Sequence, residues 1–334
     1  MGEILGFDGE RLNPDRVIIF REAVAGRIKS LLHGELIADP IKMFIKQEPH
    51  KLSKIKEGRQ RLISAVSIID TTVDRMIFQD LFSYILQRPL STPVAVGWAP
   101  TKLGAGFLKC KLPGKTFDTD KKHWDWTFPY WLLYDCYVTL LSVGVRPEWQ
   151  IKLAMARFKM LFELAVFSFP DGSQVKQLFQ GIQKSGCYLT LILNSMGQWF
   201  LHRLAELALG IEVPMVCFGD DVTQDSTDFD EDFAAFYEAL GFKLETSCND
   251  VMEFCGFKIH SCSRFIPCYR DKHVFMLRHL TLDDEIAIQT IRSYQYIYWF
   301  DKPFLAFLRD VAYLRNLPQA LVDDADIMRV IFDR

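Results

Sequence analysis

Apolar residues recur at steps of three and four in two stretches of the chain, and this period is typical of amphipathic helices. The first stretch follows Gly186 and has apolar residues at Leu189, Leu193, Met196, Phe200, Leu204 and Leu207. The second has apolar residues at Phe233, Phe236, Tyr237 and Leu240 and ends at Gly241, where glycine suits a helix C-terminus. The pattern therefore predicts two helices separated by about twenty residues.

The segment between these helices has a different pattern. Residues 213–218 form a short apolar run bounded by Gly210 and Gly219, which predicts a buried strand. Residues 115–120 and 253–259 are the other strand candidates. The order strand, helix, strand, turn, strand, helix, strand is that of a split βαβ unit. Helices and strands do not alternate regularly, so the pattern favours an α+β fold over a doubly wound sheet.

Composition narrows the class of protein. The 334 residues are 49% hydrophobic and 24% charged, which is ordinary for a globular protein and argues against disorder or a coiled coil. No run approaches 18 consecutive apolar residues, so no membrane segment is predicted. Eight cysteines without a Cys-x-x-Cys pair favour a reducing compartment.

The net charge of −3 conceals two oppositely charged segments. Residues 42–61 hold seven basic and two acidic side chains. The stretch 46–63 ends in Arg-Gln-Arg-Leu-Ile, which predicts a loop closing on a strand. Cations there could grip a triphosphate, although charge runs are usually solvated surface. Residues 220–232 hold seven acidic side chains and no basic one.

Two acidic motifs suggest a metal site. Asp220 and Asp221 follow Gly219 directly after the predicted buried strand. Two carboxylates 4 Å apart repel by about 4 kcal/mol at an effective dielectric of 20, a cost that Mg²⁺ would offset. The alternative is a solvated hairpin turn. Strand alternation over residues 115–120 places Asp118 and Asp120 on one face, where either could meet the turn.

Three carboxylates from two strands would form the kind of two-metal site that stabilises phosphoryl transfer. The alternative for residues 117–125, which include the Asp-x4-Asp pair Asp120 and Asp125, is an acidic loop before an aromatic-rich helix.

A third motif carries polar residues into an apolar helix. Gly186, Thr190 and Asn194 are four residues apart, which places them along one stripe of a helix. Asn and Thr are unfavourable there unless their hydrogen bonds are used, and a ribose hydroxyl would use them. The alternative is a helix capped by Ser185 with incidental polar residues.

The order of these motifs resembles the signature of viral RNA-dependent RNA polymerases. A basic loop is followed by Asp-x4-Asp, then Ser-Gly-x3-Thr-x3-Asn, then Gly-Asp-Asp. Within this family, the chain looks closest to the polymerases of sobemovirus-like positive-strand RNA viruses. The segments that carry this likeness are Lys-Gln-Glu-Pro-His-Lys, Gly-Arg-Gln-Arg-Leu-Ile, Trp-Asp-Trp-Thr and Glu-Phe-Cys-Gly-Phe. The resemblance covers residues 40–275.

The resemblance implies roles for individual residues. Asp120 and Asp220 would bind two Mg²⁺ ions, with Mn²⁺ as an alternative, and Asp221 would lie close by; Asp118 is a second-choice ligand. The implied nucleotide contacts are Asp125, Thr190 and Asn194 to the ribose, Ser185 and Gly186 in a mobile loop, and Lys46, Lys54, Arg59 and Arg61 to the triphosphate. Residues 253–257 resemble the turn that supports the primer end, and Lys243 is the nearby candidate for a general acid.

The resemblance also implies an architecture, a right hand with a ferredoxin-like antiparallel palm sheet flanked by helices. The expected division is fingers over 1–112 and 145–182, palm over 113–144 and 183–260, and a short helical thumb over 261–334. Family members generally have more chain before the basic motif and a larger thumb, which is compatible with a fragment or one part of a longer fused polyprotein.

The implied function is RNA-dependent RNA polymerase activity that replicates a viral RNA genome. The expected partners are template RNA, nascent RNA, ribonucleoside triphosphates and other viral replication proteins, in replication complexes of the host cytoplasm. One alternative is a non-catalytic RNA-binding fragment. A reverse transcriptase is the other, but those enzymes typically carry Tyr-x-Asp-Asp and lack the Ser-Gly-x3-Thr-x3-Asn helix.

Overall fold

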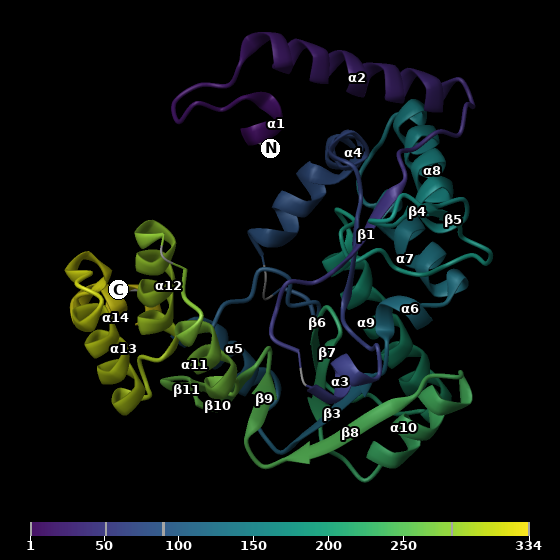
Figure 1. Ribbon diagram of the computed structural model, residues 1–334. Helices are drawn as coiled ribbons and strands as arrows, with labels where there is room; N and C mark the ends of the chain where they lie inside the picture. Colours follow the sequence, from purple (N-terminus) through teal and green to yellow (C-terminus); the bar gives the residue numbers. More distant parts are fainter. Residues whose placement is uncertain (1, 51, 89–90, 282, 333–334) are drawn as a thin grey trace. The chain divides into compact units, whose positions relative to one another are not determined.

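The computed structural model describes residues 2–50, 52–88, 91–281 and 283–332 (Figure 1). The chain divides into two compact units, and each unit is built from two chain segments. The first unit comprises Met1–Arg88 and Lys122–Phe200, and the second comprises Pro89–Lys121 and Leu201–Arg334. The predicted division into fingers, palm and thumb stays a prediction.

The first unit combines a four-stranded mixed sheet with helices. Its strands have the order β2-β1-β4-β5, with β1 antiparallel to β2 and parallel to β4. The strands are β1 (Ile41–Ile45), β2 (Leu62–Ala65), β4 (Val166–Ser168) and β5 (Gln174–Lys176). The helices are α1 (Gly2–Leu5), α2 (Pro14–Leu32), α3 (Leu52–Lys56), α4 (Ile68–Leu86), α6 (Trp124–Thr127), α7 (Tyr130–Ser142), α8 (Glu148–Phe162) and the first half of α9 (Thr190–Leu209).

Helices of the first unit begin where the sequence supplies caps, because the first amide groups of a helix have no partner within it. Asn13 accepts a hydrogen bond from the backbone N–H of Arg16 at the start of α2, and Ser67 accepts one from Asp70 at the start of α4. Helices α4, α7 and α8 bury aromatic residues that contact one another, such as Phe78, Tyr137 and Phe158.

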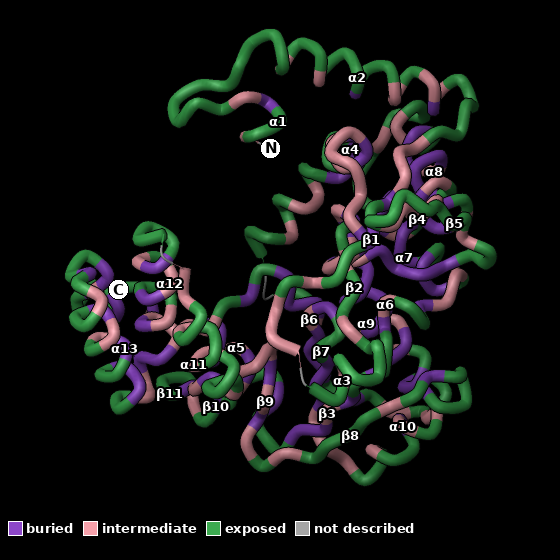
Figure 2. Tube along the Cα trace, viewed as in Figure 1, coloured by how far each residue is buried: buried purple, intermediate pink, exposed green. Residues whose placement is uncertain are grey.

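The second unit contains an antiparallel sheet of the strand order β6-β7-β3-β8. Every neighbouring pair is antiparallel. The strands are β3 (Thr116–Lys121), β6 (Met215–Phe218), β7 (Asp221–Asp225) and β8 (Leu244–Asn249), with α10 (Asp230–Ala239) between β7 and β8. This order is that of a ferredoxin-like sheet. Figure 2 shows that β6 and β7 are largely buried, as the apolar run at 213–218 predicted.

A second sheet and a group of helices complete the second unit. The sheet has the order β11-β10-β9, formed by β9 (Met252–Phe254), β10 (Phe257–Ser261) and β11 (Arg264–Pro267). The helices are α5 (Lys102–Lys111), α11 (Arg270–Arg278), α12 (Asp284–Ile297), α13 (Lys302–Leu314), η1 (Pro318–Ala320) and α14 (Asp324–Phe332). In the described part of the chain, no helix is both long enough and apolar enough to cross a membrane.

Two strand predictions were wrong. Residues 253–259 are not one strand, because Cys255 and Gly256 adopt positive φ angles of 47° and 73° and form the turn between β9 and β10. The fourth strand of the ferredoxin-like sheet is instead β8, with the sequence Leu-Glu-Thr-Ser-Cys-Asn. Most of its residues are exposed at the sheet edge, so no apolar alternation marks it.

Two helix predictions also need correction. Helix α9 begins at Thr190, so Gly186 lies in the preceding loop and not on the helical stripe. Leu204 and Leu207 are 39% and 74% exposed, whereas His202 and Glu206 are buried. The reason is a polar contact, since Glu206 accepts a hydrogen bond from the N–H of Val213 at 2.7 Å and His202 Nε2 lies 2.7 Å from the Val213 carbonyl oxygen.

Candidate active site

The β6–β7 hairpin places the Gly-Asp-Asp residues. Strand β6 pairs with β7 so that Phe218 lies opposite Asp221, which leaves a two-residue turn of Gly219 and Asp220. Gly219 has a φ of 67°, a conformation that glycine adopts without a steric penalty and that a type II′ turn needs at its first position. The turn therefore holds Asp220 at the end of the hairpin, next to Asp221.

Strand β3 brings a second pair of carboxylates to the same sheet. Asp118 lies opposite Thr223 of β7. Because side chains alternate along a strand, Asp120 shares the face of Asp118, and continuing the register places Asp120 opposite Asp221. Three carboxylates thus lie on one face of neighbouring strands.

These side chains line one cavity of about 280 Å³. Its acidic lining residues are Asp118, Asp120, Asp220, Asp221 and Glu253. None of the described residues that line it is a lysine, arginine or histidine. The predicted meeting of Asp120 and Asp220 in one cavity is confirmed, and the neighbouring second-choice residue Asp118 lies there too.

Burial and mutual repulsion disfavour the ionised form of carboxyl groups in the cavity. Burial raises the pKa of Asp118 to about 6, and Glu253 and Asp221 act in the same direction. Asp221 is exposed to solvent as a residue, but its carboxyl group is partly desolvated. This desolvation and the charge of Asp220 raise the pKa of Asp221 to about 6. Asp120 adds to this effect. The site is therefore suited to a positively charged ligand.

Polar residues missed by the sequence analysis complete the cavity. Asn249 donates a hydrogen bond from Nδ2 to Asp118 Oδ2 at 2.7 Å, while Asp118 Oδ1 is buried without a hydrogen-bond partner. Asn249 comes from β8, and Tyr269 comes from the residue preceding α11. No local pattern indicates either residue, because only the pairing of β8 with β3 brings Asn249 to the site.

The donor set fits Mg²⁺ in its chemistry. Carboxylate oxygens are ligands that Mg²⁺ prefers, and Asp118 offers an unmatched buried oxygen. Among the described residues, however, no three His, Cys, Asp or Glu side chains converge closely enough to hold an ion in their present rotamers. Mg²⁺ is usually bound by one or two carboxylates together with water and substrate phosphate oxygens, so these side chains would supply part of its coordination.

Two of the predicted ribose contacts meet in the first unit. Asn194 Nδ2 donates a hydrogen bond to Asp125 Oδ1 at 2.7 Å, across 69 positions of sequence. The hydroxyl group of Thr190 instead lies 2.6 Å from the carbonyl oxygen of Lys184 and 2.8 Å from that of Cys187. Thr190 thus fixes the loop before α9. Asp125 and Asn194, which are hydrogen-bonded to each other, are called the polar pair below.

The predicted mobile loop is bonded to β2. Ser64 and Ser185 exchange hydrogen bonds, with the Ser185 N–H donating to Ser64 Oγ at 2.8 Å and the Ser64 N–H donating to Ser185 Oγ at 3.0 Å. Ser185 therefore does not cap α9. A Cβ atom at Gly186 would lie 2.5 Å from the Ser64 carbonyl oxygen, which explains the glycine.

The basic segment contains a short helix, α3, inside the expected loop, and it ends on β2 as predicted. Its cations pair locally. Lys46 Nζ lies 3.1 Å from Glu48 and Arg61 Nη1 lies 3.5 Å from the same carboxylate, while Arg59 Nε donates to Glu57 at 2.6 Å. Lys54 lies on α3. Their contacts with a triphosphate stay predictions.

Comparison with known proteins identifies the chain's relatives. The model of the viral RNA-dependent RNA polymerase family matches residues 39–279. The chain belongs to this family. Protein P1-P2 of potato leafroll virus is 29% identical over 262 residues, which cover 73% of this chain and 24% of that protein. Replicase polyprotein P2AB of cocksfoot mottle virus is 32% identical over 221 residues, 61% of this chain and 21% of that polyprotein.

The chain spans about a quarter of the length of the curated relatives that it matches. A further relative, replicase polyprotein P2AB of southern bean mosaic virus, is 32% identical over 174 residues, 48% of this chain and 17% of that polyprotein. The predicted relation to sobemovirus-like viral polymerases is confirmed.

Proposed function

We propose that this chain catalyses template-directed RNA synthesis from ribonucleoside triphosphates. The observation that carries the proposal is the cavity shared by Asp118, Asp120, Asp220 and Asp221, four carboxylates brought together by β3 and the β6–β7 hairpin. A site with this many carboxylates and no basic residue in its described lining is suited to divalent cations and, through them, to phosphate chemistry.

In the proposed reaction, the 3′ oxygen of nascent RNA forms a bond to the α-phosphorus of the incoming nucleotide. The bond from that phosphorus to the oxygen bridging to the β-phosphate breaks, and pyrophosphate leaves. Asp120 and Asp220 would hold two Mg²⁺ ions, or Mn²⁺, with Asp221 beside them. Bound cations there would favour ionisation of the attacking hydroxyl group and offset the negative charge on the leaving group.

Residues of the first unit would position the nucleotide. Asp125 and Asn194 are already hydrogen-bonded to each other and offer polar atoms to the ribose. Ser185 and Gly186 form the loop proposed to lie beside the template and the incoming nucleotide, and Ser64 fixes the conformation of this loop. Lys46, Lys54, Arg59 and Arg61 would attract the triphosphate by charge.

The proposed biological role is replication of a viral RNA genome, with template and nascent RNA as ligands. Relatives named replicase polyprotein support this role. Other viral replication proteins would be partners, and the replication complexes of the host cytoplasm would be the location.

A non-catalytic RNA-binding fragment is the second candidate. Such a fragment would bind RNA with an affinity that falls with salt and would make no product. A reverse transcriptase would incorporate deoxyribonucleotides in preference to ribonucleotides.

Primer extension tests the proposal. The 334-residue protein is mixed with a homopolymer template, the complementary ribonucleotide and Mg²⁺, with and without a primer. We expect synthesis by the wild type and a loss of at least about 10³-fold in Asp220→Asn, because the change removes a charge from the proposed metal site.

Asp228→Asn is the matched control, since Asp228 is exposed in the same acidic segment and does not line the cavity. Its activity should equal that of the wild type. Near-wild-type synthesis by Asp220→Asn would contradict the role of the cavity, and RNA binding without synthesis by the wild type would favour the fragment.

A further inference from the structure

A second, much smaller cavity lies in the first unit beside two of the proposed nucleotide contacts. Its volume is about 20 Å³, which is room for one water molecule or one hydroxyl group. Its polar lining includes Ser64 of β2, Asp125 of α6 and the loop residues Gln183, Lys184 and Ser185, and Phe167 is among its apolar lining residues.

Gln183 is the unexplained residue of this cavity. Its side chain is 3% exposed, and both its amide nitrogen Nε2 and its amide oxygen Oε1 lack a hydrogen-bond partner. Buried polar groups are nearly always paired, so an amide with two unmatched atoms needs an explanation. It faces a cavity that could hold the missing partner.

The backbone holds Gln183 in this place. Its N–H donates to the carbonyl oxygen of Asp125 at 2.7 Å. The preceding Ile182 has a φ of 57°, which is an outlier for a β-branched residue. Lys184, the next residue, is buried and donates from Nζ to the Ile182 carbonyl oxygen at 2.8 Å. The loop is therefore fixed on both sides of Gln183 in a conformation that has a local cost.

The chemistry of the amide defines the ligand. A group that satisfies both Nε2, a donor, and Oε1, an acceptor, must itself accept and donate a hydrogen bond, as a hydroxyl group does. An ionised phosphate oxygen only accepts, and a nucleobase is far too large for 20 Å³. Asp125, which also lines the cavity, accepts a hydrogen bond from Asn194, so a sugar hydroxyl at this place would lie beside both Gln183 and the proposed ribose contact Asp125.

We propose that Gln183 binds a ribose hydroxyl group of the incoming nucleotide and is a further residue that selects ribonucleotides. The inference rests on the proposed function, because it assigns a substrate contact to the same reaction. A nucleotide lacking that hydroxyl would leave the amide unpaired, as it is in the structure, and would lose the corresponding affinity.

Gln183→Met tests the proposal, because methionine has a similar length and no amide. Single-nucleotide incorporation is measured with ribonucleotide, 2′-deoxynucleotide and 3′-deoxynucleotide. We expect kcat/KM for the ribonucleotide relative to one deoxynucleotide to fall about 10-fold, and the deoxynucleotide affected identifies the hydroxyl group. An unchanged ratio against both would overturn the proposal.

Gln198→Met is the matched control. Gln198 is also buried with both amide atoms unpaired, but it is not among the residues that line this cavity. Its ratio should stay at the wild-type value. An equal fall in both variants would mean that any buried glutamine change disturbs sugar selection, which would contradict a specific contact.

Thermal unfolding without nucleotide gives a readout independent of activity. If the cavity is a ligand site, Gln183→Met removes two unpaired groups and its Tm should equal or exceed that of the wild type. A marked fall in Tm would show that Gln183 holds a permanent structural water instead, and would overturn the proposal.

The proposed function and this inference can fail separately. Should the wild type make no product, the gain in Tm with ATP is compared with the gains given by its 2′-deoxy and 3′-deoxy analogues. A preference for ATP that Gln183→Met loses and Gln198→Met keeps would support the contact, and equal gains in the wild type would contradict it.

Discussion

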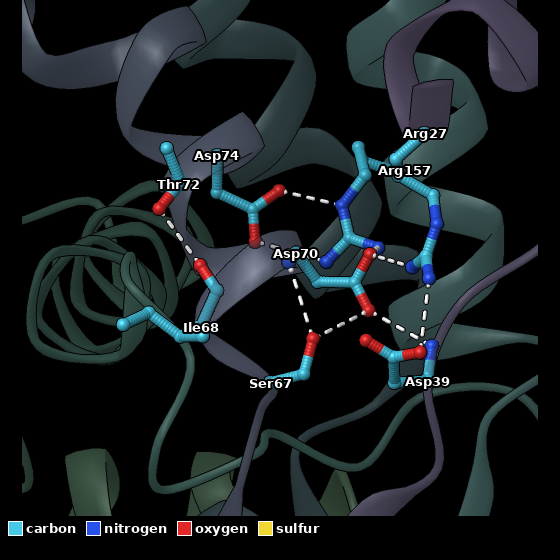
Figure 3. Close-up of polar contacts among 8 residues, drawn as sticks. All are labelled: Arg27, Asp39, Ser67, Ile68, Asp70, Thr72, Asp74 and Arg157. Atoms are coloured by element: carbon cyan, nitrogen blue, oxygen red, sulfur yellow. Dashed lines mark hydrogen bonds and ion pairs between the residues drawn. The ribbon is translucent and has the colours of Figure 1, made fainter. Parts of the chain in front are cut away.

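Two clusters of carboxylates in this molecule are built in opposite ways. In the first unit, Asp39, Asp70 and Asp74 are matched by Arg27 and Arg157 (Figure 3). In the second unit, five acidic side chains line the cavity around Asp120 and Asp220, and no basic residue is among its described lining residues. Both clusters concentrate negative charge, but only the first one has arginines among its described members.

The details of the first cluster show what compensation requires. Arg157 is fully buried and donates from Nε and Nη2 to the two oxygens of Asp74 at 2.8 and 3.0 Å. It also lies 3.0 Å from Asp70, which Arg27 contacts from α2. Burial raises the pKa of Asp74, and the charge and hydrogen bonds of Arg157 oppose that rise. This network joins α2, α4 and α8, and each of its three carboxylates has an arginine partner.

The difference teaches how a structural and a functional cluster can be told apart. The network of Figure 3 satisfies its charges and therefore serves stability. The cavity leaves Asp118 Oδ1 without a partner and raises two carboxyl pKa values to about 6, which lowers stability in the absence of a cation. Carboxylates gathered in a cavity whose described lining holds no basic residue indicate a positively charged ligand.

The largest effect is expected from breaking the compensated cluster. Arg157→Met should lower the free energy of unfolding by about 3–5 kcal/mol, because it leaves Asp70 and Asp74 buried without their partner. Urea unfolding measures this change. Arg21→Met, at an exposed position of α2, is the control and should change the free energy by less than about 0.5 kcal/mol. A loss below 1 kcal/mol in Arg157→Met would show that the cluster is not structural.

An intermediate effect is expected at the polar pair Asp125–Asn194, where a carboxylate contacts an amide and not an arginine. Asn194→Ala should reduce the preference for ribonucleotides over deoxyribonucleotides about 10-fold, since it removes a hydrogen-bonding group from the proposed ribose site. Competition between the two nucleotides in primer extension measures the ratio. An unchanged ratio would remove this pair from sugar selection.

The smallest effect is expected from neutralising a carboxylate of the acidic cavity. Asp118→Asn should stabilise the metal-free protein at pH 7, because the folded-state pKa of about 6 lies above the ordinary value of 3.8. Such a difference corresponds to about 3 kcal/mol, and solvent screening of this half-buried carboxyl reduces the expected gain to about 1 kcal/mol.

The gain depends on pH because the pKa of Asp118 is higher in the folded state than in the unfolded state. Between pH 3.8 and 6 the folded state binds more protons at Asp118 than the unfolded state, so stability falls as the pH rises through this window. The advantage of Asp118→Asn should therefore be complete above pH 6 and disappear below about pH 4. Unfolding in EDTA across this range measures it, and a gain that is independent of pH would refute the electrostatic explanation.

Local pattern was enough to predict the parts of the site that glycine and apolar runs mark. The buried strand before Gly219, the turn at Gly219 and the alternation that places Asp118 and Asp120 on one face all follow from neighbouring residues. The order of the motifs then predicted the family, which the comparisons confirmed.

Residues placed by long-range pairing were not predictable in this way. Asn249 lies on β8, an edge strand with no apolar alternation, and reaches the cavity only through its register with β3. Ser64 contacts Ser185 across 121 positions. Periodicity predicted that Leu204 and Leu207 face the core, but His202 and Glu206 on another face of α9 are buried instead, and both contact Val213.

The central claim is that Asp120 and Asp220 together bind divalent cations, and calorimetric titration of the protein with Mg²⁺ or Mn²⁺ at pH 7.5 tests it most directly. We predict binding by the wild type that weakens at least 10-fold in both Asp120→Asn and Asp220→Asn and is unchanged in Asp228→Asn. Equal affinity in all four proteins would contradict the account.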